Sequence, residues 1–159
     1  TQSYSEYLSD LSSWYAKNVG EDFLACRGQI AQLLQEESSL MEIVKLIGAD
    51  VLPDDQKLVI ETARVIRVGF LQQNAYHKED TYVPLAKQLG MMKVILHLHQ
   101  SAKALVAAQV PLSTILATGL FDKASRIKYD VPNDKTELLD DYILDIDKTL
   151  ENLRASRPA

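Results

Sequence analysis

Apolar residues recur at intervals of three and four along almost the whole chain, which is the spacing of one face of an α-helix. A first helix is predicted to begin after Ser3, within a capping box, and Gly20 is predicted to end it. A second helical pattern runs from about Glu21 and is predicted to stop at Gly48. The first third of the chain is therefore expected to form two helices.

A third helix is predicted after the turn ADVLPDDQK. Pro53 suits the first helical position, and the two aspartates that follow it stand where the helix dipole favours negative charge. Steps of three and four place one apolar stripe along this helix, formed by Val59, Ala63, Ile66 and Phe70. Phe70 thus ends the stripe where the polar segment QQN begins.

The second half of the chain also follows helical spacing. A long helix is predicted from Pro84 to about Ala108, and Pro111 forces the next break. Two short elements follow, and a final helix is predicted to start with Asn133 or Asp134 as its cap. No repeat and no convincing strand pattern occurs, so the predicted fold is all-α, an irregular bundle of about six or seven helices without a sheet, in one domain spanning residues 1–159.

Composition is consistent with such a bundle and excludes some partners. The chain has 159 residues, of which 47% are hydrophobic and 25% charged, typical of a globular domain. Its formal net charge is −5 and no stripe of Lys and Arg forms, so nucleic acid is not expected to bind. The apolar runs are too short to span a bilayer, so no direct membrane insertion is expected.

Two further features concern the setting of the chain. Cys26 is the only cysteine, which fits a reducing cytosol and a small core side chain rather than a nucleophile. The sequence opens with TQSYSEYLSDL, without an initiator methionine, and enters a helical pattern at once. We expect from this that the chain is one domain of a longer polypeptide.

The residues that carry chemistry do not converge on a catalytic or metal site. His97 and His99 point roughly 200° apart on a helix and cannot grip one ion, while His77 has no spaced carboxylate or thiol partner. The three histidines are interpreted as polar surface or satisfied core residues, and the aspartates of the last helix as a solvated face. No GxxxxGK[ST] loop occurs, so the chain alone is not expected to hydrolyse a nucleotide.

Two segments keep two interpretations each. The acidic turn ADVLPDDQK is either an ordinary helix start or an exposed contact surface. The corner FLQQNAY is either a helix end, with Asn74 as cap and Phe70 and Tyr76 in the core, or a wall for a flat heterocycle. From the residues alone, the ordinary interpretation is favoured for both, because aromatics at helical spacing usually belong to the core.

The order of residues in this region adds a resemblance. Residues 33–82 read LLQEESSLMEIVKLIGADVLPDDQKLVIETARVIRVGFLQQNAYHKEDTY. This run resembles the C-terminal helical domain of the catalytic subunit (alpha chain) of V/A-type rotary ATP synthases and ATPases, and the likeness extends loosely over the whole chain. The resemblance implies a parent that couples ATP synthesis or hydrolysis to ion translocation, using ATP or ADP with Mg. The chain itself is expected to bind no nucleotide tightly.

The resemblance implies two roles for this domain. Phe70 would pack against adenine, with the approach lined by Gln72, Gln73, Asn74, Ala75 and Tyr76. The turn before the third helix would face the central rotor shaft, through Asp50, Pro53, Asp54 and Asp55. This turn is less acidic than its F-type counterpart, so steric pushing is favoured over charge pairing. One helix would link the two, about 25 Å from Pro53 to Phe70.

The resemblance also implies partners and a place in the cell. The partners would be the B subunits and the central shaft subunits of the rotary complex. The domain would belong to the soluble motor head, which is cytoplasmic and peripheral to the membrane. The competing interpretation is a stand-alone helical interaction or regulatory module with no nucleotide role, in which FLQQNAY is merely core and cap.

Overall fold

The computed structural model describes residues 9–71 and 83–156, with side chains described from residue 20 onward. Within these ranges every regular element is helical, which confirms the predicted all-α fold. The elements are α2 (Ser9–Ile47), η1 (Ala49–Val51), α3 (Asp54–Ile66), the π-helix η2 (Arg67–Leu71), α4 (Leu85–Ala107), α5 (Leu112–Leu116), α6 (Leu120–Ser125), α7 (Ile127–Asp130) and α8 (Leu138–Ala155).

The predicted break at Gly20 is wrong, because α2 runs without interruption through this position. One glycine inside a helix costs only about 1 kcal/mol, which packing readily offsets. The offsetting contacts come from one face of α2 that is buried against the core, formed by Cys26, Ile30, Leu33 and Leu40. The predicted stop at Gly48 is confirmed, and its φ of 88° lies in the region that glycine adopts at little cost.

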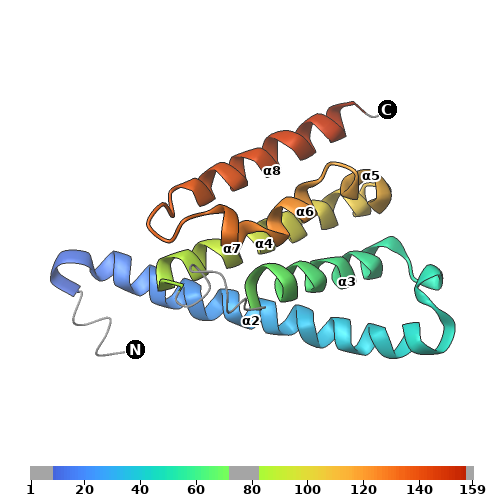
Figure 1. Ribbon diagram of the computed structural model, residues 1–159, viewed down its shortest axis with the longest axis horizontal. Helices are drawn as coiled ribbons and strands as arrows, with labels where there is room; N and C mark the ends of the chain where they lie inside the picture. The colour runs from blue at the N-terminus through green and yellow to red at the C-terminus, as the bar shows by residue number, and fades with distance from the viewer. Residues whose placement is uncertain (1–8, 72–82, 157–159) are drawn as a thin grey trace.

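The helix α4 is the centre of the bundle. It lies between the antiparallel pair α2–α3 and the last helix α8 (Figure 1), and it packs against all three. Its apolar side chains are buried on more than one face, including Met91, Met92, Val94, Ile95 and Leu98, each at most 1% exposed. Gly90 leaves room for the side chain of Leu139, so α8 lies directly on the α4 backbone.

The ends of the helices differ in small ways from the predictions. Pro53 occupies the N-cap of α3 rather than its first helical position. The last helix begins at Leu138, and its predicted caps, Asn133 and Asp134, lie in the preceding turns. Successive backbone bonds there span three residues, as in Lys135 N–H to Pro132 O (3.0 Å), so the chain makes turns before it settles into an α-helix.

A buried lysine joins the start of α4 to the connection before α8. Lys87 is fully buried, and its ammonium donates hydrogen bonds to the carbonyl oxygens of Lys128 (2.7 Å) and Val131 (2.6 Å). It also donates to the Asn133 side-chain oxygen at 2.8 Å. A buried ammonium is tolerated where it is hydrogen-bonded in this way. These hydrogen bonds hold the segment between α7 and α8 in place, although that segment has no regular secondary structure.

The lone cysteine and two of the histidines are where the sequence suggested. Cys26 is buried in the core. His99 is 4% exposed, and a hydrogen bond of 2.7 Å joins its Nδ1 to the Thr62 hydroxyl on α3, so it is a satisfied core histidine. His97 is partly exposed at the surface, with Nε2 2.5 Å from Asp147. The segment with His77 lies outside the described residues.

Burial of His99 predicts an acid-sensitive core. Burial, followed by the charge of Lys103, lowers the pKa of His99 to about 4, while the unfolded chain binds that proton near pH 6.5. The unfolded state therefore takes up more protons as pH falls, so stability is full above pH 6.5 and is lost as pH falls toward 4. We expect this group to lower the free energy of unfolding by about 2 kcal/mol between pH 7 and pH 5.

The test is urea denaturation across that range for the wild type and for His99→Asn, which cannot titrate there. The difference in unfolding free energy between the two proteins is expected to change with pH by this amount. His97→Asn is the matched control on the surface of the same helix. If the control removes the acid dependence and His99→Asn retains it, the assignment to the buried ring is wrong.

Candidate functional site

The predicted contact turn, residues 49–57 (ADVLPDDQK), leads from α2 into α3 at one end of this pair of helices. The turn follows Gly48 and contains the 3-10 turn η1, and Leu52 anchors it, being 6% exposed. Asp50 and Pro53 are exposed on its surface. The turn is therefore short and tied to the core, while its polar and proline side chains are accessible.

The same end carries large exposed aliphatic side chains that sequence reasoning missed. On the last turns of α2 they recur at steps of three and four, so they share a face of the helix. This surface, which we name the apolar tip, consists of Ile43 (40% exposed), Leu46 (84%), Ile47 (61%) and Val51 (58%). Exposed apolar clusters of this kind are typical of protein contact surfaces. The signal was present as an apolar run at the end of a helix, but the pattern alone could not show that the run stays uncovered.

The aspartates of the turn differ in what they bind. The Asp54 carboxylate accepts a hydrogen bond of 2.9 Å from the Leu112 backbone N–H, the first residue of α5. It therefore caps a neighbouring helix as well as starting its own. Asp55 is exposed, and its carboxylate accepts only a local hydrogen bond, from the Gln56 N–H, among those described (3.0 Å). Of the two, Asp55 is the one available to a partner.

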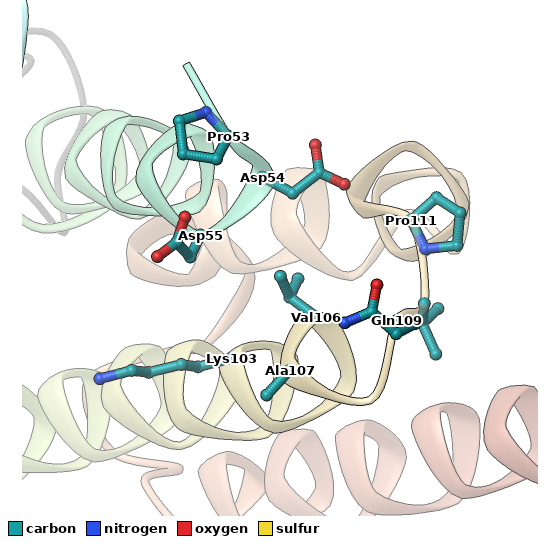
Figure 2. Close-up of a pocket in the computed structure, with 9 residues that line it drawn as sticks. Pro53, Asp54, Asp55, Lys103, Val106, Ala107, Gln109 and Pro111 are labelled. Carbon is teal, nitrogen blue, oxygen red and sulfur yellow. The ribbon is translucent and has the colours of Figure 1, made fainter.

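A groove lies beside the turn, between the start of α3 and the end of α4 (Figure 2). Its volume is about 570 Å³, and it is lined by Pro53, Asp54, Asp55, Lys103, Val106, Ala107, Gln109, Val110 and Pro111. Figure 2 shows the Asp54 side chain directed toward the helix that follows Pro111, away from Asp55. Charges of both signs at the rim give the groove no single preference for an anion or a cation.

Phe70 lies at the other end of the continuous helical segment formed by α3 and η2, far from the turn. It belongs to the π-helix η2, which continues α3, and its half-buried ring packs against the core. A Cβ at Gly69 would lie 2.9 Å from the carbonyl oxygen of Ala124 and from the Cα of Ser125, so η2 touches the α6 backbone. Short π-helices are rare and occur frequently at functional sites.

An ion pair that the sequence did not reveal holds the start of η2. The Arg67 guanidinium donates two hydrogen bonds to the Glu37 carboxylate of α2, at 2.9 and 2.7 Å. These bonds lower the pKa of Glu37 and raise the pKa of Arg67. No local pattern connects two residues that lie 30 positions apart, which is why sequence reasoning missed the pair.

The structure describes all four predicted residues of the contact turn, and of the predicted wall residues it describes Phe70. The contact turn leads into the start of α3, whereas Phe70 lies in η2, which continues the other end of that helix. The other predicted wall residues lie outside the described residues: Gln72, Gln73, Asn74, Ala75 and Tyr76. In residues 9–71 and 83–156 no cluster of three His, Cys, Asp or Glu side chains is arranged to hold a metal ion. None of the helices described is long and apolar enough to cross a membrane.

Comparisons with known proteins point to one family. Residues 12–116 match the family described as the C-terminal domain of V and A type ATP synthase. The chain is 41% identical over 152 residues to the V-type ATP synthase alpha chain of Halothermothrix orenii, covering 96% of this chain and 26% of that protein. It is 48% identical over 132 residues to the V-type ATP synthase alpha chain 2 of Clostridium tetani, covering 83% of this chain and 22% of that one.

An archaeal relative shows a similar extent of match. The corresponding A-type ATP synthase chain of Methanopyrus kandleri is 42% identical over 153 residues, covering 96% of this chain and 26% of that protein. The chain thus spans about a quarter of the length of the curated relatives it matches. In these relatives the likeness includes the helices after residue 116, beyond the matched family region.

The two aspartates of the turn give a matched pair for testing stability. Asp54→Ala removes the acceptor for the Leu112 N–H and is expected to lower the free energy of unfolding by about 1 kcal/mol, as loss of a helix cap does. Asp55→Ala removes an exposed carboxylate of the same helix turn and is expected to cost about 0.5 kcal/mol or less. Chemical denaturation measures both values. Equal losses would show that the bond from α5 contributes nothing.

Proposed function

Because the chain belongs to the family of C-terminal domains of V- and A-type ATP synthases, we propose that it serves as that domain in the catalytic subunit of a rotary ATP synthase or ATPase. The observation that carries the proposal is the match to these synthase chains across nearly the whole sequence. The complex couples ATP synthesis or hydrolysis to ion translocation. This chain has no phosphate-binding loop, so it contributes binding surface and movement, and alone it is inactive.

In this role Phe70 forms part of the wall against the adenine ring. An aromatic ring suits that task because stacking on a flat heterocycle needs an apolar plane and no charge. The half-buried ring in a short π-helix supports the assignment, since packing against the core holds the side chain in place and leaves part of it accessible. The amides and the tyrosine of residues 72–76 complete the wall in this proposal. The phosphates of ATP or ADP and the Mg ion are held by other domains of the parent protein.

The apolar tip and the turn beside it contact the central shaft. Large aliphatic side chains at the surface can be covered by a partner with a favourable change in free energy, and Leu46 is exposed by 84%. Asp54 is engaged within the domain, which weakens any mechanism based on charge pairing. We infer that the shaft acts on this end by steric and apolar contact, as a rigid turn anchored by Leu52 permits.

The two contacts are joined by α3 and η2. A helix transmits displacement along its axis with little bending, and the rod from Asp54 to Leu71 has the shaft contact at one end and Phe70 near the other. A tilt of this rod changes the position of the wall when the shaft turns. The domain therefore links shaft angle to the opening of the nucleotide site, within the cytoplasmic head of the complex and beside the B subunits.

A second function is favoured by one observation, the apolar tip itself. A stand-alone regulatory module would also present such a surface to a protein partner. In that case Phe70 is a core residue, and its substitution changes stability without any effect on nucleotide affinity. The Phe70 test distinguishes the two functions.

Replacing Phe70 by Leu in the complete complex keeps an apolar side chain but removes the flat aromatic ring. We expect nucleotide affinity to be about two- to tenfold weaker, since stacking contributes about 0.5–1.5 kcal/mol beyond burial. Titration calorimetry with ADP measures it, and Phe70→Tyr is expected to retain affinity. Val68→Ala, on an exposed side chain of the same π-helix, is the control. Unchanged affinity in Phe70→Leu would remove the ring from the adenine wall.

Replacing Leu46 by Asp tests the shaft contact. A carboxylate forced into an apolar interface loses its hydration, so the contact is expected to weaken. We expect ATP hydrolysis by the complex to continue while the ions transported per ATP fall by about half or more. Proton or sodium uptake into vesicles, measured beside ATP hydrolysis, gives that ratio. The matched variant Asp50→Ala tests charge pairing: if it uncouples the complex and Leu46→Asp does not, the contact is electrostatic.

A further inference from the structure

We propose that Glu37 and Arg67 are positioning residues that fix the turn bearing Phe70 against α2. The inference rests on the proposed function, because it concerns how the adenine wall is held. Arg67 is the first residue of η2 and stands three positions before Phe70. Whatever fixes Arg67 therefore sets the start of the turn from which the ring projects.

The geometry of the Glu37–Arg67 pair fixes the orientation of the Arg67 side chain as well as its distance from α2. Both guanidinium NH₂ groups donate to separate oxygens of one carboxylate, at 2.9 and 2.7 Å. A two-pronged contact of this kind fixes orientation, which a single point charge cannot do. The Glu37 side chain is only 10% exposed, whereas that of Arg67 is 50% exposed. The Glu37 carboxylate is thus a buried acceptor in a fixed position on α2. Its bonds to Arg67 anchor the first residue of η2 to that position.

The turn is held from a second side by packing. Gly69 lies against the backbone of Ala124 and Ser125 in α6, where no side chain fits. Glu37 on α2 and the α6 backbone thus grip η2 through residues 67 and 69. The contact at Gly69 limits approach to α6 but supplies no directed bond. The ion pair supplies that bond, so its loss is expected to let Phe70 shift.

The pair also gives α2 a part in coupling. Glu37 stands ten residues before Ile47, which is about 15 Å along the helix that carries three residues of the apolar tip. Displacement of the tip therefore reaches the turn of Phe70 along α2, through Glu37 and Arg67, as well as along α3. Two helices joined at both ends resist bending more than one helix does.

The experiment compares single and exchanged variants in the complete rotary complex. For Glu37→Gln and for Arg67→Met we expect amide hydrogens of residues 67–71 to exchange about tenfold faster without nucleotide, because a local opening becomes easier. We expect the KM for ATP to rise about fivefold with a smaller change in kcat, as misplacement of a binding group does. The exchanged double variant Glu37→Arg with Arg67→Glu is expected to recover part of both.

A matched control is available in another ion pair between helices. Lys93 of α4 and Asp22 of α2 are joined at 3.0 Å and are both about half exposed, away from η2 in the sequence. Lys93→Met should leave both readouts unchanged. If it changes them as strongly as Glu37→Gln, the effect is general loosening and the positioning role is wrong.

The two readouts separate this inference from the proposed function. Faster exchange with an unchanged KM supports positioning of the turn and removes Phe70 from the nucleotide site. Unchanged exchange in both single variants overturns the positioning role, whatever happens to the KM. Faster exchange and a raised KM, both reduced again in the exchanged variant, support the inference together with the adenine wall.

Discussion

Burial of α4 on several faces is the constraint on which the arrangement depends. A helix covered by α2, α3 and α8 must be apolar around much of its circumference, and Met92, Ile95 and Leu98 meet this demand with almost no exposure. The buried polar groups on α4 need internal partners. His99 has the Thr62 hydroxyl, and the Lys87 ammonium has three oxygens near α7. These contacts orient the neighbouring helices without requiring short or regular connections.

Against this fixed centre, α3 acts as a rod with different surroundings at its two ends. Its start is held to α5 through Asp54 and lies beside an uncovered apolar tip. Its continuation into η2 is fastened to α2 and packed closely on α6. An uncovered end is suited to receiving force from a partner, and a fastened end to placing a side chain accurately. Under the proposed function, this difference would separate movement at one end of the helix from nucleotide binding at the other.

What the sequence could predict follows from the range of each interaction. Helical spacing correctly indicated an all-α bundle, the stop at Gly48 and the long helix ending before Pro111, because these are local effects. The prediction from Gly20 was wrong because glycine disfavours a helix by only about 1 kcal/mol. Burial of one face of α2 stabilises the helix by more than that. The pair of Glu37 with Arg67 had no local signal and depends on the packing of two helices. Of the predicted wall residues, the structure describes only Phe70, in the π-helix that continues α3.

The acidic turn shows why residue types alone do not define a contact. Three aspartates within six residues suggest an electrostatic surface, yet Asp54 is engaged in holding α5. The accessible surface beside the turn also carries large aliphatic side chains from the preceding helix, Ile43, Leu46 and Ile47. Apolar contact is short-ranged and insensitive to the sign of a partner's charge, whereas exposed carboxylates are screened by salt. If this end contacts a turning shaft as proposed, that insensitivity would be an advantage, because each new angle of the shaft would present different charges to the surface.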